Sequence, residues 1–325
     1  MTTDRTYGIE IECFANVGQI QLAQEITANF ALQGINHSVT VVGRYRPTTD
    51  GANVSEWEIK PDGSLRATPT QSRQGYRGIE VVSPVLRGID GLKALKVVTD
   101  ALNRNNCKVN KTAGLHIHHG VNEREMRLVA ANWFRNESVV MAGLPESRRR
   151  NKYCKRWHSM IRSQREVARI AHSKYVALNL SSYALRGTIE FRCAAGSVEY
   201  AKIANWAMFT QAFVERSINA EFAAGTAQEL ADWLAPQTAQ PNFKAGSLKA
   251  QLRDFLATPR RWSEVKAHFG RQMSKEKVAL NAAGLIEQDG DLFKSVPAGN
   301  AIYRQAAEWF VGRVQRFSPA MAAAA

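Results

Sequence analysis

Two glutamates separated by one residue stand near the start of the chain, in the segment YGIEIECF. Successive side chains on a strand point to opposite faces, so Ile9 and Ile11 would share one face while Glu10 and Glu12 share the other. Two residues span about 7 Å along a strand, a spacing at which two carboxylates can serve adjacent cations. A single pair of this kind is usually a solvated strand face, so the interpretation needs support from other segments.

Three later segments place apolar residues on one face of a strand and chemically active side chains on the other. Glu80 lies in GIEVVSPVL, His116 and His118 lie in GLHIHHG, and Glu190 lies with Arg192 in TIEFRCA. If the four polar faces belong to one sheet, four carboxylates meet there, and their mutual repulsion requires cations. Carboxylate-rich sites favour Mg²⁺ or Mn²⁺ over zinc. The residues therefore predict a divalent-cation site suited to phosphoryl transfer.

The strands that would carry these side chains alternate with segments of helical spacing. Period-two alternation predicts strands at residues 7–14, 57–60, 78–86, 114–120 and 188–194. Helical spacing predicts helices at residues 19–33, 90–103, 123–141, 156–171 and 199–216, and a short helix from a capping box at Thr226 and Glu229 through Trp233. This order predicts an α+β fold, in which a largely antiparallel sheet is backed by helices on one face.

The blocks GIEIE, GIEVVSPVL, GLHIHHG, KYVALNL and TIEFR occur in this order over residues 6–216, with Asp62-Gly63-Ser64 after the second predicted strand. They resemble the signature of the amidoligases, a family of carboxylate–amine ligases that shares its catalytic sheet with glutamine synthetase and γ-glutamylcysteine ligase. The resemblance implies a glutamine-synthetase-like fold and an ATP-dependent reaction. ATP would phosphorylate a substrate carboxylate, and an amine would then displace phosphate from the acyl phosphate to form an amide.

The resemblance also implies roles for individual residues. The metal ligands for two or three Mg²⁺ (or Mn²⁺) ions would be Glu10, Glu12, Glu80 and Glu190, with His116 at the metal or the phosphate and His118 beside it. Arg192 would stabilise the transferring phosphoryl group, and Asp62 would orient or deprotonate the amine. Lys174 and Asn179 would contact nucleotide or substrate. The implied partners are a carboxylate substrate and an amine or ammonia donor, with a glutamine amidotransferase or a peptide or protein substrate as candidates.

A second domain is predicted near the C-terminus, where a polar linker is followed by short helical segments and a hairpin signal. We divide the chain into a catalytic domain at 1–236, a polar linker at 237–246, a small domain at 247–318 and a frayed tail at 319–325. Three short helical segments, starting at Ser247, Thr258 and Ser274, precede a hairpin signal at Asp289-Gly290 and a last amphipathic helix. This outline is typical of a winged helix, and the segment 274–283 is the candidate for contacts with DNA.

The net charge of +14 is concentrated in two places. Residues 148–174 contain ten Lys or Arg against one acid, and the chain from residue 245 onward carries the remaining excess of positive charge. The segment 148–174 is either a solvated basic face or a rim that attracts ATP or an acidic substrate. The four dispersed cysteines and the absence of a long apolar run lead us to expect a cytoplasmic protein without disulfides or a membrane span.

Two other classes of function fit parts of the sequence. A nucleic-acid-binding regulator would use the winged helix and keep only a degenerate catalytic sheet. A metal-dependent hydrolase would use His116 and His118 with the carboxylates. All four carboxylates are intact, and Arg192 beside Glu190 suits phosphoryl chemistry, so the ligase is the favoured interpretation.

Overall fold

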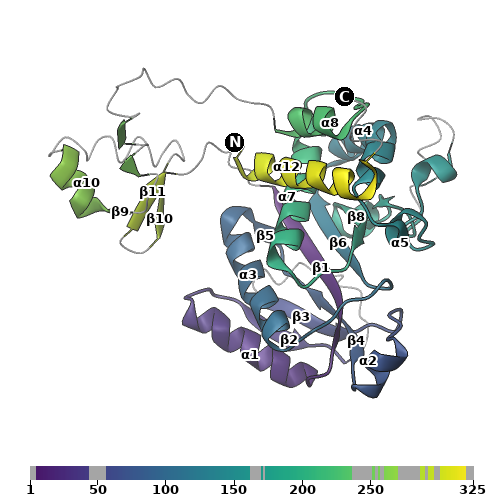
Figure 1. Cartoon of the computed structure of the whole chain (residues 1–325), viewed down its shortest axis with the longest axis horizontal. Helices are drawn as coiled ribbons and strands as arrows, with labels where there is room; N and C mark the ends of the chain where they lie inside the picture. The colour runs from purple at the N-terminus through teal and green to yellow at the C-terminus, as the bar shows by residue number, and fades with distance from the viewer. Residues whose placement is uncertain are drawn as a thin grey trace. The chain divides into compact units, whose positions relative to one another are not determined.

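The computed structural model describes residues 5–43, 56–161, 170, 173–235, 251–252, 255–256, 260–269, 286–289, 292–295 and 301–319. Contacts divide the chain into two compact units, which are described separately. The first unit comprises residues 3–234 together with 306–325, and the second comprises residues 235–305 with residues 1–2. The predicted catalytic strands all lie in the first unit (Figure 1).

The first unit is built on an eight-stranded sheet within the described residues. Its order is β2-β3-β4-β1-β6-β8-β7, with β5 paired to β1. The strands are β1 (Thr6–Ala15), β2 (Ser38–Val41), β3 (Glu56–Pro61), β4 (Arg77–Val82), β5 (Leu86–Arg87), β6 (Gly114–Gly120), β7 (Leu178–Asn179) and β8 (Thr188–Ala195). All of these pairings are antiparallel except β2 with β3. The predicted α+β class and largely antiparallel sheet are confirmed.

The strand register brings the chemically active residues together at the centre of the sheet. Glu12 of β1 lies opposite Glu80 of β4, and Glu10 lies opposite His116 of β6. On the other side of β6, His118 lies opposite Glu190 of β8. The alternate residues of the same strands form the apolar face, where Ile9, Ile11, Ile117 and Phe191 are buried.

Helices cover the apolar face of this sheet, and Figure 1 shows α1, α3 and α7 in front of the strands. The helices are α1 (Gln19–Leu32), α2 (Pro69–Arg73), α3 (Gly88–Arg104), α4 (Glu123–Ala142), α5 (Glu146–Arg149), α6 (Ser182–Arg186), α7 (Tyr200–Ser217) and α8 (Ala227–Leu234). Rings of Trp133, Phe191 and Phe213 meet edge to face with centroids 5.5 to 6.2 Å apart. These aromatic contacts join α4 and α7 to β8. The predicted capping box at Thr226 and Glu229 is present at the start of α8.

One predicted helix is wrong at its start. Within the range 156–171 the structure describes residues 156–161, which contain the 3-10 turn η1 (Trp157–Ser159) and no α-helix, and residue 170; residues 162–169 and 171 lie outside the described residues. The buried carboxylate of Glu137 accepts hydrogen bonds from the backbone N–H groups of Trp157 (2.6 Å) and His158 (2.9 Å). This side chain therefore satisfies backbone donors at the start of the segment.

The last helix, α12 (Ala301–Phe317), packs with the first unit from Ala306 onward. The ring of Phe310 stacks on Phe209 with centroids 4.4 Å apart, and a Cβ at Gly143 would collide with the Phe310 ring. Arg313 Nε donates to the carbonyl oxygen of Gly143 at 2.9 Å. The sequence grouped this helix with the C-terminal domain, whereas its apolar stripe is buried against α7 and the end of α4.

The second unit contains β9 (Arg260–Arg261), α10 (Trp262–Phe269), β10 (Ile286–Asp289) and β11 (Leu292–Ser295). The strands form a sheet in the order β10-β11-β9, and the predicted hairpin is present because Asp289 pairs with Leu292. The candidate DNA-contacting segment 274–283, the linker 237–246 and most of the helix predicted from Ser247 lie outside the described residues. The winged helix stays a prediction. None of the helices in the described part of the chain combines the length and apolar content that a bilayer crossing requires.

Candidate active site

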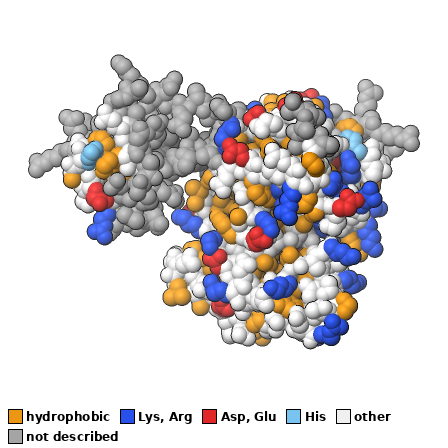
Figure 2. Space-filling view, viewed as in Figure 1, with side chains coloured by type: hydrophobic (Ala, Val, Ile, Leu, Met, Phe, Trp, Pro, Cys, Tyr) orange, Lys and Arg blue, Asp and Glu red, His pale blue; other side chains and the backbone are white. Residues whose placement is uncertain are grey.

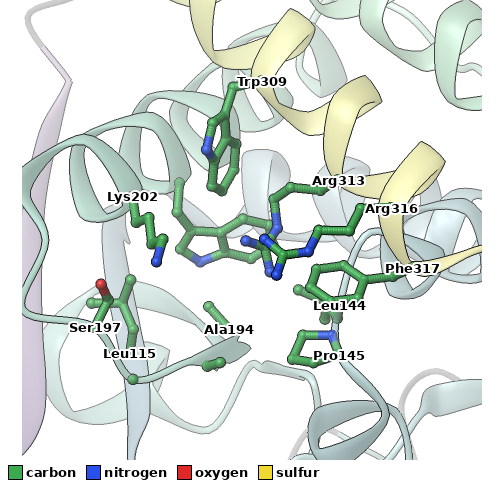
Figure 3. A pocket seen from close by; sticks show the side chains of 13 residues that line it. Leu115, Leu144, Pro145, Ala194, Ser197, Lys202, Trp309, Arg313, Arg316 and Phe317 are labelled. Atoms are coloured by element: carbon green, nitrogen blue, oxygen red, sulfur yellow. The ribbon is translucent and has the colours of Figure 1, made fainter. Parts of the chain in front are cut away.

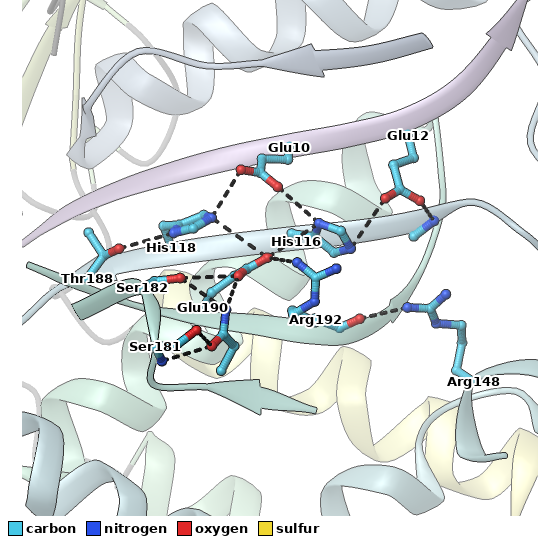
Figure 4. Close-up of polar contacts among 12 residues, drawn as sticks. Glu10, Glu12, His116, His118, Arg148, Ser181, Ser182, Thr188, Glu190 and Arg192 are labelled. Carbon is cyan, nitrogen blue, oxygen red and sulfur yellow. Dashed lines mark hydrogen bonds and ion pairs between the residues drawn. The ribbon is translucent and has the colours of Figure 1, made fainter. Parts of the chain in front are cut away.

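Side chains from the four adjacent strands β4, β1, β6 and β8 converge on the polar face of the sheet. Figure 4 shows those of β1, β6 and β8. We call them the acid–imidazole cluster: Glu10, Glu12, Glu80, His116, His118, Glu190 and Arg192. All seven were predicted as site residues from the sequence. They meet because alternation fixes the face of each strand and the register aligns the strands.

Glu10 occupies the centre of the acid–imidazole cluster. Its Oε2 lies 3.0 Å from His116 Nδ1, and its Oε1 lies 3.2 Å from His118 Nε2. Burial raises the pKa of Glu10, but the charge of His118 and the hydrogen bonds from both histidines hold that pKa well below its usual range. Glu10 is therefore ionised, with one oxygen directed to each imidazole.

Glu190 is held by three neighbours. Its Oε2 accepts hydrogen bonds from Asn179 Nδ2 at 2.7 Å and Ser182 Oγ at 3.3 Å, and its Oε1 pairs with Arg192. Burial raises the pKa of Glu190, but the charges of His118 and Arg192 bring it below the ordinary value. Only 4% of the side chain is exposed, so an ionised carboxylate is fixed in a nearly dry position.

Glu12 and Gly114 are in direct contact beside these residues. The backbone N–H of Gly114 donates to Glu12 Oε2 at 2.5 Å, and His116 Nε2 lies 3.5 Å from Glu12 Oε1. A Cβ at Gly114 would lie 2.9 Å from His116 Nε2 and 3.2 Å from both Glu12 Oε2 and Arg148 Nη2. A glycine at this position therefore allows a carboxylate, an imidazole and a guanidinium group to approach the backbone closely.

Glu80 shows how much negative charge the cluster contains. Burial raises the pKa of Glu80 well above its usual value, and the charges of Glu10, Glu12 and Asp62 raise it further, against an opposing effect of Lys60. A carboxyl group in this position retains its proton unless a positive charge is supplied. The electrostatics therefore favour a bound cation next to Glu80.

Two groups of side chains have the spacing of metal ligands: Glu10, Glu80 and His116 in one, and Glu10, His118 and Glu190 in the other. The ligand atoms within each group lie within 4.8 Å of one another. His118 Nδ1 lies 3.1 Å from Thr188 Oγ1, and its buried Nε2 lies 3.2 Å from Glu10 Oε1. When Nδ1 carries the proton and donates it to Thr188, the Nε2 lone pair can bind a cation in place of the contact with Glu10. The carboxylate oxygens suit Mg²⁺ or Mn²⁺, whereas the imidazole nitrogens are ligands that zinc, iron, nickel and copper also accept.

A β-bulge in β8 begins at Arg192, which strand alternation places on the same face as Glu190. Leu115 lies opposite Ala194 and Ile117 lies opposite Phe191, so two residues, Arg192 and Cys193, face the single intervening residue of β6. The buried guanidinium group of Arg148 donates to the carbonyl oxygens of Arg192 (Nη2, 2.7 Å) and Cys193 (Nε, 3.3 Å). Arg148 thus binds both residues of the bulge from outside the strand pair.

The structure places the other predicted site residues at different distances from the cluster. Asn179 belongs to the site through its bond to Glu190. Asp62 is close enough for its charge to raise the pKa of Glu80, and its Oδ1 accepts from the backbone N–H of Ser64 at 2.7 Å. Lys174 is exposed, and its ammonium group lies 5.1 Å from the centroid of the Tyr175 ring, so the described contacts do not bring it to the cluster.

The basic segment 148–174 is partly structural. Arg148 holds the bulge, Arg149 donates to Ser318 Oγ (2.9 Å) and to the carbonyl oxygen of Phe317 (3.0 Å), and Arg150 pairs with Glu146 at the surface. On the face drawn in Figure 2, Lys and Arg side chains gather at the right-hand edge of the first unit, where Figure 1 places α5. Of the three consecutive arginines, Arg148 and Arg149 therefore bind backbone carbonyl groups, and Arg150 makes only a surface ion pair.

Four residues of the site were not assigned from the sequence: Gly114, Arg148, Ser182 and Thr188. Ser182 could have been found, since it follows Asn179 in the segment NLSS before the strand of Glu190. The contact of Arg148 has no local signal, because the two carbonyl groups that it binds are 44 and 45 residues away.

Comparison with known proteins agrees with this geometry. A search of curated proteins found no match. A family model described as "putative amidoligase enzyme" matches residues 3–214, which span the whole sheet and every residue of the acid–imidazole cluster. On that match, the chain belongs to the amidoligase family.

Proposed function

We propose that this protein is an ATP-dependent carboxylate–amine ligase that forms an amide bond through an acyl phosphate. Membership of the amidoligase family supports amide-bond formation by a ligase. The observation that carries the finer proposal is the position of Glu10, whose two oxygens face two separate imidazoles and so belong to both candidate metal groups. A carboxylate shared between two divalent cations is suited to phosphoryl transfer.

The proposed reaction has two displacements. A carboxylate oxygen of the substrate attacks the γ-phosphorus of ATP, the bond to the β–γ bridging oxygen breaks, and ADP leaves with the electron pair. The amine nitrogen then attacks the acyl carbon, phosphate leaves, and the nitrogen loses a proton to a base. When bound, Mg²⁺ or Mn²⁺ supplies charge neutralisation for the triphosphate and the transferring group.

In this reaction the residues of the chain bind the cations and orient the reacting groups. The ligands for the cations are Glu10, Glu12, Glu80 and Glu190 with His116 and His118. Asn179 and Ser182 fix the carboxylate of Glu190 in one orientation by donating to the same oxygen. Asp62 lies near Glu80 and is the candidate to orient the amine and accept its proton.

Arg192 is the candidate for stabilising the transferring phosphoryl group. One Nη atom pairs with Glu190, its buried Nε has no hydrogen-bond partner, and 17% of the side chain is exposed. The pKa of Arg192 is lowered by burial but raised overall by Glu190, Glu10 and Glu12, so the group is always charged. A planar guanidinium group can hold two equatorial oxygens, which a lysine ammonium group cannot do in a bidentate manner.

The test is to trap the acyl phosphate. Hydroxylamine reacts with acyl phosphates to give hydroxamates, so the protein is incubated with ATP, Mg²⁺, hydroxylamine and a panel of amino acids and dicarboxylic acids. We expect hydroxamate and ADP to form in equal amounts with at least one acid. Arg192→Lys should retain Mg·ATP affinity and lose about 10³-fold in rate, whereas Glu190→Gln should lose both. Arg127→Lys, on the exposed face of α4, is the matched control.

Two results would contradict the proposal. One is equal ATP affinity with Mg²⁺ and with EDTA, since the cluster would then bind nucleotide without cations. The other is a rate for Arg192→Lys equal to that of Arg127→Lys, because the acyl-phosphate mechanism would then lack its main charge stabiliser.

A further inference from the structure

A cavity lies on the helix-covered side of the sheet, between α7, α12 and the ends of β6 and β8 (Figure 3). Its volume is about 200 Å³. We call it the α12 pocket, and all of its lining residues belong to the first unit. The lining consists of three cationic side chains, several aromatic and aliphatic side chains and a short stretch of β8: Leu115, Leu144, Pro145, Ala194, Ala195, Gly196, Ser197, Lys202, Trp206, Trp309, Arg313, Arg316 and Phe317.

Positive charge converges on the α12 pocket. Figure 3 shows the guanidinium groups of Arg313 and Arg316 and the ammonium group of Lys202 directed into it. Arg313 makes one hydrogen bond, from Nε to the carbonyl oxygen of Gly143. Lys202 pairs with Glu199, whereas no carboxylate among the residues that the structure describes pairs with Arg313 or Arg316. Burial lowers the pKa of Arg313, and the charge of Arg316 lowers it further, which is the behaviour of uncompensated like charges.

The walls of the α12 pocket are apolar and partly aromatic. The guanidinium carbon of Arg313 lies 5.0 Å from the ring centroid of Trp309 and 5.0 Å from that of Phe317, and Leu144 and Pro145 line the same side as Phe317 (Figure 3). An apolar cavity of about 150 Å³ is large enough for benzene. The α12 pocket therefore has room for one ring together with an acidic group that faces the cations.

The α12 pocket is separate from the acid–imidazole cluster. The β8 bulge places Ala194 opposite Leu115, and both lie on the helix-covered face, whereas Glu10 and Glu190 lie on the other face. A molecule in this pocket would therefore leave the candidate metal ligands free. It would contact the strands that carry His116 and Arg192.

We propose that the α12 pocket is a binding site for a small organic anion, in which a carboxylate or a phosphate is joined to a single flat ring. The cations bind the acidic group, and Trp309 and Phe317 contact the ring. This site does not depend on the function proposed for the cluster.

Calorimetry with four simple probes tests the proposal on the full chain, in EDTA so that no divalent cation is present at the cluster. Phenyl phosphate and benzoate share a ring and an anion, benzylamine carries the same ring with the opposite charge, and inorganic phosphate has no ring. We expect one-to-one binding of phenyl phosphate or benzoate, at least tenfold tighter than inorganic phosphate, and no binding of benzylamine. The tighter of the two aryl anions identifies the acidic group.

Variants locate the binding. Arg316→Gln should weaken the aryl anion about tenfold, as expected for loss of a charge-assisted hydrogen bond, and Lys202→Gln should weaken it in the same direction. Both side chains are exposed, so these changes leave the fold intact. Arg127→Gln removes the same charge from an exposed position on α4 and is the control. Absence of aryl-anion binding at millimolar concentration, or equal affinities in Arg316→Gln and Arg127→Gln, would overturn the proposal.

Discussion

Replacing Arg148 by methionine tests whether the bulge in β8 depends on this buried guanidinium group. Arg148 is 3% exposed and makes two hydrogen bonds to backbone carbonyl oxygens, at 2.7 Å to Arg192 and 3.3 Å to Cys193. Methionine has a similar length and is apolar, so Arg148→Met keeps most of the packing and removes both charged donors.

The expected cost follows from these two bonds. A hydrogen bond to a charged group contributes about 1.5–3 kcal/mol, and the 3.3 Å bond belongs at the weak end of that range. Allowing for water to enter the space of the guanidinium group, we expect the free energy of unfolding to fall by about 3 kcal/mol. For a unit of this size that corresponds to a fall in Tm of roughly 6–12 °C.

Urea unfolding followed by circular dichroism measures the change. Arg150→Met is the matched control, because Arg150 lies two residues away with 86% of its side chain exposed and should cost less than about 0.5 kcal/mol. Arg148→Lys should recover only part of the loss, since one ammonium group cannot reproduce the two-armed contact. If Arg148→Met costs no more than Arg150→Met, the bulge is stable without the guanidinium group and our account of how Arg192 is positioned is wrong.

Three further predictions concern charge and orientation. Because the pKa of Glu80 is raised in the folded state, metal-free stability should fall as pH rises above about 4.3, and Glu80→Gln should flatten Tm against pH in EDTA. Asn179→Ala frees the carboxylate of Glu190 and should weaken Mn²⁺ binding about tenfold by calorimetry; unchanged affinity would count against the orienting role. Burial lowers the pKa of His37, whose Nδ1 accepts from Trp57 Nε1 at 3.0 Å, so stability should decline as pH falls below about 6.5, and His37→Phe should remove that decline in acid titrations.

The part of the candidate site that depends on strand alternation could be predicted from the sequence. A period of two requires no knowledge of distant residues, so the polar faces of Glu10, Glu12, His116 and His118 could be assigned from each segment alone. Family resemblance then supplied the expectation that these faces adjoin one another, and the strand order of the sheet places them side by side.

Features that depend on contacts between residues far apart in the sequence could not be predicted. The bulge at Arg192 and Cys193 is set by register and by Arg148, neither of which leaves a local pattern. Strand β2 was not predicted. It has only four residues, and it pairs in parallel with β3. The helix predicted at 156–171 failed at its start, because the buried Glu137 binds the backbone N–H groups there.

The position of α12 changes how the second unit should be regarded. The chain leaves the first unit after Leu234 and rejoins it at Ala306, so residues 235–305 are an insertion within a domain and not a C-terminal appendage. A chain truncated at the apparent linker would lose Phe310 from its stack on Phe209, the partners of Arg149, and one wall of the α12 pocket. To isolate the first unit, residues 235–305 should instead be replaced by a flexible linker that joins Leu234 to Ala306. This deletion keeps the part of α12 that packs with the first unit.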